Sequence, residues 1–473
     1  MSINKTSVVL LTSLLSLSSL SVFAAPPAQQ EQLDQSRAQE AERQERLSEE
    51  RAEVVAPPPP SSDLPADESV RFHISHVTVE HQTERFRFLE RLSRPYEGKE
   101  LSLHEINDLV TAMNRALMSR GFSTSRVAVP EQNLSSGELR LVLLVGYIHV
   151  VRFADGSDTV YWKNLFPFRA GDVLNVRDIE QGIEQAKRLP SQDISVRLLP
   201  ADQPQMTDIE LTVKRSKNIY GTISFDDSGL KDTGRLQWYT SLGIDQLFHK
   251  NDMLRIGMNL DGARDGYEKG TRGHNISYTY PYGRHTFSLS YQRSKYHQTV
   301  ASMPYDFISA GDTNISTLSW DYVLNRSANR KTSMDIRLRK RNSHRFLNDV
   351  ELPIQAMHQT SMEIGLAERL YLKRDTLYFR LAHRFGLGWM GAQEESPYED
   401  MPRTRYRMWL LDADYVHPFE FSHRPATFTT SFHGQWTMDG MELYGTDMIS
   451  MGNRYTVRGF DGEVTLMGTD GWY

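Results

Sequence analysis

In the second half of the chain, apolar and polar side chains alternate over segments of roughly ten residues, a length that suits strands crossing a bilayer. Phe287, Leu289 and Tyr291, for example, are separated by Ser288 and Ser290. Alternation with a period of two is typical of strands that have one apolar and one polar face. Gly, Asn, Asp and Pro separate the segments. The pattern therefore predicts an all-β region of the kind that forms the wall of a transmembrane barrel.

Alternation alone does not separate a membrane barrel from a soluble sandwich, whose apolar face lies in the core. Aromatic residues at the segment ends favour the membrane, because they are enriched at membrane–water interfaces. Bacterial single-chain barrels have even numbers of strands, so an odd count predicts an incomplete antiparallel barrel over residues 217–473. Eleven segments fit the pattern, at about 219–227, 234–244, 252–262, 272–281, 284–295, 312–324, 330–342, 358–370, 373–390, 404–417 and 424–438.

Residues 70–216 predict two copies of a small α/β unit. In the first copy, Ser102 and Glu105 have the spacing of a capping box at a helix start, and Gly121 is placed to end that helix. The second copy begins at residue 147 and is shorter, with Asn175 opening its main helix. The other elements are expected at 72–79, 84–92, 125–129, 138–145, 147–153, 163–166, 194–199 and 208–214. We therefore expect α+β domains ahead of the barrel.

The first 24 residues predict a signal peptide. Lys5 gives a short basic start, an apolar run follows from Val8 to Val22, and Val22-Phe23-Ala24 fits a cleavage site. The apolar run is about 15 residues long, shorter than the roughly 20 that a membrane-spanning helix needs. We expect an exported protein whose mature chain begins near Ala25.

Residues 25–54 predict a polar helix, because oppositely charged side chains recur at helical spacing. An apolar face is almost absent, so this helix is either solvated or placed in a polar lumen. Composition leaves both possibilities open, as well as disorder. The tetraproline at 57–60 predicts a semi-rigid linker over residues 55–69.

Composition and motifs reduce the number of possible partners, metal sites and enzyme classes. The net charge of −6 is small for 473 residues and argues against a nucleic-acid partner. The absence of cysteine excludes disulfides and thiolate metal sites. The 15 histidines are scattered, which indicates lumen and loop residues and no metal site. Neither a Gly-x-Ser-x-Gly motif nor a phosphate-binding loop is present, so the residues indicate no cofactor and no enzyme.

Three motifs carry a resemblance to a known family. They are GFSTSR followed by PEQNLSSGEL within 121–139, GDVLNVRDIEQG at 171–182, and YTVRGFDGE at 455–463. With the repeated α/β unit and the barrel segments, they resemble the transporters of two-partner secretion, barrels that carry polypeptide-transport-associated (POTRA) domains. The signature residues of this resemblance are Gly121, Phe122, Pro130, Gln132, Gly137 and Leu139 in the first POTRA domain and Gly171, Asn175, Asp178 and Glu180 in the second.

The resemblance implies an outer-membrane transporter with its POTRA domains in the periplasm. Its partner would be a secreted exoprotein with an amino-terminal secretion domain: a haemolysin, an adhesin or a contact-dependent inhibition toxin. The resemblance further implies contact with outer-membrane lipid and a monomeric state. It implies neither a nucleic-acid partner nor a cofactor. The helix at 25–54 would plug the pore until the partner docks.

The resemblance also assigns a role to the loop at 439–470, which would fold back into the lumen. Val457, Arg458, Gly459 and Phe460 would form its lock motif. A guanidinium inside a barrel needs an acidic partner, because an unpaired buried charge is costly. In relatives that partner lies on a later strand, which would fall beyond residue 473.

Two departures from the family pattern accompany this resemblance. The family has sixteen strands, of which 11 to 12 would be present, so the sequence predicts a fragment or a truncated product. Residues 200–207 keep only the proline of the family's usual Pro-Gly turn.

Four other functions stay open on the sequence. They are an outer-membrane lipid hydrolase, a factor that assembles other barrels, a passive pore, and a truncated gene product without function.

Overall fold

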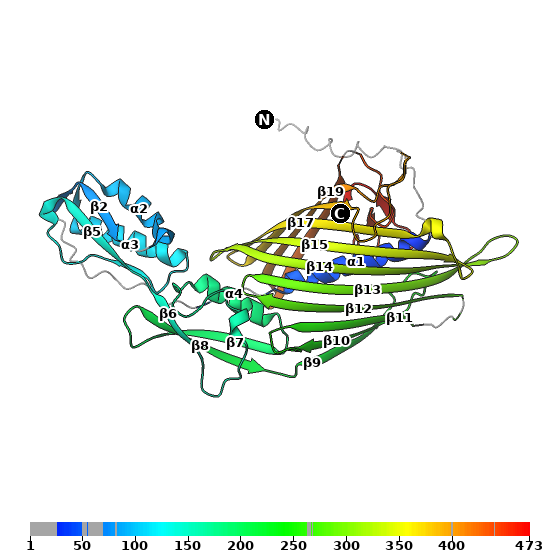
Figure 1. Ribbon diagram of the computed structural model, residues 1–473, viewed down its shortest axis with the longest axis horizontal. Helices are drawn as coiled ribbons and strands as arrows, with labels where there is room; N and C mark the ends of the chain where they lie inside the picture. Colours follow the sequence, from blue (N-terminus) through cyan, green and yellow to red (C-terminus); the bar gives the residue numbers. More distant parts are fainter. Residues whose placement is uncertain are drawn as a thin grey trace, which may run out of the picture.

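The computed structural model describes residues 26–49, 54, 70–80, 83–262, 266, 268–398, 401–438 and 440–473. The predicted signal peptide at 1–24 and the linker at 55–69 lie outside these described residues. Figure 1 shows two small α/β domains at one end of a large curved sheet, with one long helix lying among the barrel strands. None of the described helices combines the length and apolar character that crossing a bilayer requires.

The large sheet is antiparallel, and strands that follow one another in sequence pair with one another. All eleven predicted segments form strands, so the predicted barrel wall is confirmed. The short β23 (Gly471–Trp472) pairs with the end of the last long strand, and β16 (Val350–Glu351) extends a hairpin at its edge. The long strands are β9 (Ile219–Asp226), β10 (Gln237–Asp245), β11 (Met253–Asp261), β12 (Lys269–Tyr282), β13 (His285–Val300), β14 (Phe307–Arg326), β15 (Arg330–Leu347), β17 (Met357–Leu372), β18 (Asp375–Leu387), β19 (Arg407–Phe421) and β20 (Arg424–Thr437).

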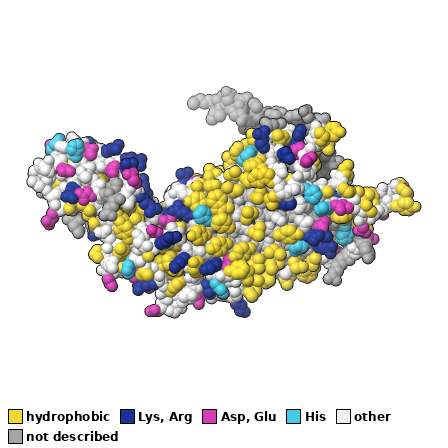
Figure 2. Space-filling model, in the orientation of Figure 1, with side chains coloured by type: hydrophobic (Ala, Val, Ile, Leu, Met, Phe, Trp, Pro, Cys, Tyr) yellow, Lys and Arg dark blue, Asp and Glu magenta, His cyan; other side chains and the backbone are white. Residues whose placement is uncertain are grey.

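The alternation along these strands separates an apolar outer face from a polar inner face. Ile223, Leu289 and Leu318 are exposed, and the two leucines stand directly opposite each other in the β13–β14 pair. Charged residues on the other face are buried, for example Asp335 and Arg380. Figure 2 shows hydrophobic side chains gathered over the strands, with Lys, Arg and His side chains concentrated toward both ends. The lipid-facing and lumen-facing sides predicted by the period of two are therefore present.

The first α/β domain packs its helices on a three-stranded sheet around one hydrophobic core. Ser102 and Glu105 form both hydrogen bonds of the predicted capping box. The strand predicted at 72–79 is wrong as one element, because the chain breaks at Ser75, where the amide donates to the Gly137 carbonyl. The elements are β1 (Arg71–Ile74), β2 (His76–Glu80), η1 (Glu84–Phe86), α2 (Phe88–Ser93), η2 (Arg94–Tyr96), β3 (Lys99–Ser102), α3 (Leu103–Ser119), β4 (Arg126–Ala128), η3 (Leu134–Ser136) and β5 (Glu138–Leu144). The two halves of the break join different sheets, β1 with β3 and β2 with β5.

The second α/β domain repeats this plan with a second core. Its sheet has the order β6-β8-β7, with β6 parallel to β8. Its elements are β6 (Tyr147–Phe153), η4 (Trp162–Asn164), α4 (Val176–Lys187), β7 (Gln192–Pro200) and β8 (Met206–Arg215). Figure 1 shows α4 next to the barrel end, between the first domain and the strands.

The polar helix α1 (Pro26–Ser48) lies among the barrel strands. After β20 the chain forms a long loop. This loop contains two short strands that pair with each other, β21 (Ile449–Met451) and β22 (Leu466–Gly468). A further short helix, η5 (Pro353–Gln355), precedes β17.

Candidate functional site: the lumen and its entrance

Helix α1 is held in the lumen mainly by ion pairs and hydrogen bonds. The carboxylate of Glu31 lies 2.7 Å from Arg345, and that of Glu42 lies 2.9 Å from Arg337. At the end of the helix, Glu49 lies 2.8 Å from Arg369 and also contacts Lys331. Of the alternatives left open by composition, the structure therefore favours the polar lumen.

The partners of the helix form a column of cations on the inner face of β15. Because inner-facing residues recur every second position, this face presents five cations and one carboxylate. They are Lys331, Asp335, Arg337, Arg339, Arg341 and Arg345. Residues 29–49, most of α1 and the residue after it, carry six carboxylates and three guanidiniums, so this segment and the inner face of β15 have opposite net charge.

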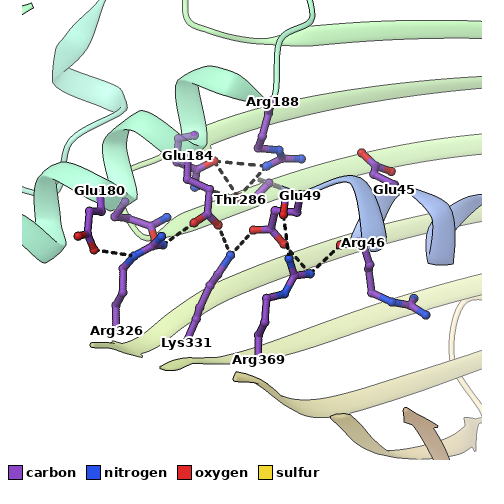
Figure 3. Close-up of polar contacts among 12 residues, drawn as sticks. Glu45, Arg46, Glu49, Glu180, Glu184, Arg188, Thr286, Arg326, Lys331 and Arg369 are labelled. Atoms are coloured by element: carbon purple, nitrogen blue, oxygen red, sulfur yellow. Dashed lines mark hydrogen bonds and ion pairs between the residues drawn. The ribbon is translucent and has the colours of Figure 1, made fainter. Parts of the chain in front are cut away.

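At the barrel end next to the second α/β domain, which we call the entrance, Lys331 joins the helix to that domain. Its ammonium contacts both Glu49, the residue after α1, and Glu184 of α4. Arg326 also pairs with Glu184, at 2.5 Å. Figure 3 shows the carboxylates of Glu49, just beyond the end of α1, and of Glu184 on α4 converging on Lys331. A shift of α4 would therefore alter the charges that face the end of α1.

The two carboxylates differ in their proton affinity. Burial raises the pKa of Glu184, and the neighbouring charge of Glu49 raises it further. Burial also raises the pKa of Glu49, but the positive charges of Lys331 and Arg369 outweigh it and hold that pKa well below its usual range. Glu49 is therefore the permanent anion of this pair.

Signature residues of the second domain anchor it to the barrel. The carboxylate of Asp178 accepts a hydrogen bond from Arg284 in the turn between β12 and β13, at 2.6 Å. Glu180 lies 3.5 Å from Arg326 at the end of β14. The buried Asn164 amide donates to the Pro281 carbonyl at 3.1 Å, a contact that the sequence analysis missed.

Two further signature residues join the α/β domains to each other. Gly121 has a φ of +91°, and a Cβ there would lie 2.2 Å from the side-chain oxygen of Asn175. Asn175 caps α4 and also donates to the Arg120 carbonyl at 3.1 Å. Only glycine suits this position, because of both its φ and the close approach.

The remaining signature residues lie in turns or pack in the core of the first α/β domain. Phe122 and Leu139 are buried in that core. The Gln132 side chain bridges to the backbone of Arg140, accepting at 2.7 Å and donating at 2.8 Å. Gly137 and Gly171 both have positive φ, and Pro130 is partly buried between β4 and Gln132.

The loop after β20 is attached to the barrel wall by Asp447. Its carboxylate lies 3.3 Å from Arg341 and accepts from the Gln359 amide at 2.9 Å. The Arg341 and Asp447 side chains are only 3% and 4% exposed, so this is a buried ion pair. The sequence analysis missed both residues, since no spacing pattern distinguishes Asp447 from other loop acids.

The predicted lock motif lies elsewhere in the same loop. The Arg458 side chain is 77% exposed, and its guanidinium is 4.0 Å from the carboxylate of Glu40 in α1. Gly459 has a φ of +108°, and both Val457 and Phe460 are exposed. Arg458 borders a cavity of about 450 Å³ between α1 and the wall.

Comparison with protein-family models gives matches along most of the chain. Residues 205–473 match the haemolysin secretion/activation protein family, described as ShlB/FhaC/HecB. Residues 72–146 match the ShlB-type POTRA domain and residues 147–200 a POTRA domain.

Among curated proteins, the chain is similar to the outer membrane transporter CdiB-2 of Burkholderia pseudomallei, at 38% identity over 82% of this chain and 67% of that protein. It is 31% identical to the outer membrane transporter CdiB of Dickeya dadantii, over 79% and 66% of the two chains. The hemolysin transporter protein ShlB of Serratia marcescens is 27% identical over 79% and 66%. The chain thus spans about two thirds of the length of these relatives.

Solved structures show the same architecture. CdiB from Escherichia coli superposes with a TM-score of 0.84 at 25% identity, over 95% of this chain and 83% of that one. CdiB from Acinetobacter baumannii gives a TM-score of 0.80 at 26% identity, over 94% and 83%.

Proposed function

This chain belongs to the haemolysin secretion/activation family of outer-membrane transporters, and on that premise we propose that it captures a partner exoprotein and passes it through the lumen that α1 occupies. It is an outer-membrane protein with its POTRA domains in the periplasm. The partner we propose is a haemolysin, an adhesin or a contact-dependent inhibition toxin whose amino-terminal secretion domain pairs with residues 70–216. We propose further that the chain acts as a monomer and without enzymatic activity.

The POTRA sheets support capture of an extended chain. Strands β2 and β4 form the two edges of the first three-stranded sheet, and β6 and β7 form the edges of the second. A sheet edge with free backbone groups can bind an extended segment by adding a strand. The proposed partner would enter the periplasm unfolded, which suits this mode.

The observation that carries the proposal is the nature of the helix in the lumen. Leu33 is the one buried hydrophobic side chain among the described residues of α1. The other contacts of α1 are polar, and polar contacts can be exchanged for water or for a passing polypeptide. We infer that α1 closes the lumen at rest and leaves when the partner docks.

We also propose a role for the loop motif Val457 to Phe460. Arg458 and Arg43 both lie near Glu40, at 4.0 Å and 2.6 Å. Departure of α1 would remove Glu40 and so break its contact with Arg458. Arg458 could then pair with another carboxylate. In this proposal the motif responds to the departure of the helix.

A deletion strain tests the transport function against its rivals. We expect at least one large exoprotein to disappear from the surface and medium, and to return on complementation. Lipid hydrolysis and the amounts of other barrel proteins should stay unchanged. An unchanged exoproteome, or a general loss of barrel proteins, would contradict the proposal.

Crosslinking tests the departure of the helix, since the chain has no native cysteine. The Thr313 hydroxyl on β14 donates to the Glu31 carboxylate of α1 at 2.5 Å, and it also shares a hydrogen bond with the Ser343 hydroxyl of β15 at 2.9 Å. Bridging Glu31→Cys and Thr313→Cys with a short bismaleimide should stop secretion. Bridging Thr313→Cys and Ser343→Cys joins two wall strands and should not. Equal secretion by the two bridged proteins would refute the proposed departure.

A further inference from the structure

On the outer face of four adjacent strands, β12 to β15, the apolar band gives way to charged residues, which are cationic on β12, β13 and β15. On β13 the outward residues Leu289 and Tyr291 are followed, two positions later, by Arg293. On β15 the outward Leu338 is followed by Lys340. Because outward positions recur every second residue, these changes lie on the lipid-facing side.

The registers of the strands bring the cations into one patch. Arg272 stands opposite Lys295, and His274 opposite Arg293, in the β12–β13 pair. Lys295 in turn stands opposite Asp312 in the β13–β14 pair. Arg293 and Lys295 both contact Asp312, at 2.6 Å and 2.9 Å. One carboxylate is thus shared by two cations.

Two cations of the patch have no such partner. No ion pair or hydrogen bond links the Arg272 or Lys340 side chain to any other residue that the structure describes. With Arg293 and Lys295 they give four permanent cations against the carboxylate of Asp312. We name these four residues the outer-wall cationic patch.

The patch is local and does not form part of a ring around the barrel. At the same end of β18, the outward residues are Phe385 and Leu387. At the same end of β20, the outward residue is Trp436, which stands opposite Trp409. Aromatic side chains there suit the interface of an ordinary bilayer. The outer face of β12 to β15 therefore differs in charge from that of β18 and β20 at the same end of the wall.

The patch lies at the cell-surface end of the wall. The opposite end carries the turns that contact the second POTRA domain, including Arg284, which pairs with Asp178. Since the POTRA domains are periplasmic, Arg272, Lys295 and Lys340 lie at the level of the outer leaflet. Cations at the edge of the hydrocarbon are costly unless an anion pairs with them.

We propose that the outer-wall cationic patch binds the phosphate groups of a phosphorylated glycolipid in the outer leaflet. Its acyl chains would cover the apolar band below, at Leu289, Leu318 and Leu338, while its phosphates would lie between Arg272 and Lys340. The site serves anchoring and orientation of the wall, and it does not depend on which protein is exported.

Lipid retention during purification tests the site. The protein is reconstituted in nanodiscs that contain bisphosphorylated lipid A or the same lipid A without phosphates, and lipid retained after detergent exchange is measured by mass spectrometry. Each cation near an anionic lipid surface contributes about fivefold in affinity. We expect the double variant Arg272→Gln, Lys340→Gln to bind the bisphosphorylated lipid about thirtyfold more weakly. The dephosphorylated lipid should bind weakly to both proteins.

A matched control removes two cations from the other end of the wall. Lys373 and Arg374 occupy the exposed turn between β17 and β18, and the variant Lys373→Gln, Arg374→Gln should retain lipid A as the unaltered protein does. Equal retention by the two double variants would overturn the proposal, as would equal binding of lipid A without phosphates. Should the patch variant fail to insert, competition by high salt on the unaltered protein gives the same test: retention that is unaffected by salt overturns the site.

Discussion

Replacing Lys331 by methionine removes the cation that joins the plug helix to the second POTRA domain. The ammonium contacts Glu49 and Glu184, and both carboxylates are left facing each other across the site of the lost charge. Methionine is an unbranched side chain only one heavy atom shorter than lysine, so the lost interaction is mainly electrostatic. We expect α1 to leave the lumen more readily in this variant.

The expected magnitude follows from the contacts that remain. Breaking a buried pair costs roughly 3–5 kcal/mol when one charge is left without any partner. Here Glu49 keeps Arg369 at 2.8 Å, and Glu184 keeps Arg326 at 2.5 Å. We therefore expect about half of that cost, about 2 kcal/mol, which shifts the balance between docked and released helix about thirtyfold.

Thiol labelling reports this balance directly. Ser36 is buried on α1, and Ser36→Cys gives the chain its single thiol. The rate of maleimide labelling should rise about thirtyfold in the Lys331→Met background. Adding Glu184→Gln should reverse part of the increase, because it removes one of the two facing carboxylates.

The neighbouring variant Arg330→Met is the control. Arg330 pairs with Glu368, and neither side chain belongs to the network at the entrance. Its labelling rate should match that of the parent protein. Equal rates in the Lys331→Met and Arg330→Met backgrounds would refute the coupling through Lys331.

Three further variants test other parts of the site. Deleting residues 26–49 removes six carboxylates and three guanidiniums from the lumen, so the open channel should prefer anions, as measured by its reversal potential in a salt gradient across a planar bilayer. Gly121→Ala should strain the φ of +91° and displace Asn175, which should lower the stability of the POTRA pair by about 1–3 kcal/mol, as measured by thermal unfolding and by faster trypsin cleavage between the two domains. Asp447→Ala leaves the buried Arg341 without its carboxylate, a cost of roughly 3–5 kcal/mol, and should make the loop after β20 sensitive to added protease.

The strands of the barrel could be predicted from sequence because each one obeys a local rule. Period-two alternation places apolar side chains on the lipid face whatever the partner strand is, so all eleven segments were found. The capping box at Ser102 and Glu105 is also local, since both hydrogen bonds lie within one helical turn. Such features need no knowledge of the rest of the fold.

The break at Ser75 and the place of α1 depend on distant residues. The Ser75 amide donates to the carbonyl of Gly137, more than sixty positions later, and no residue pattern near Ser75 predicts that contact. A helix without an apolar face has the same composition in solvent as in a charged lumen. The charged side chains on the inner face of the wall decide between them, and the cations of β15 can be recognised as such partners only once the inner face of the strand is known. The pairing of Asp447 with Arg341 escaped prediction for the same reason.

Helix α1 buries little apolar surface, and this makes its release from the lumen easier. Burying Leu33 contributes roughly 2 kcal/mol, so the hydrophobic effect holds the helix only weakly. An apolar plug would leave behind an apolar wall that binds unfolded polypeptides, whereas this plug leaves a polar wall of hydrated cations and carboxylates, such as Arg337 and Asp335. Since separating α1 from the wall returns the charges of both partners to water, each ion pair costs less to open than its direct attraction alone, so an event at α4 can contribute to the release of the helix. A more apolar plug, made by Gln35→Leu and Gln39→Leu, should therefore slow secretion, and secretion at the unaltered rate would show that polarity of the plug is not what permits its release.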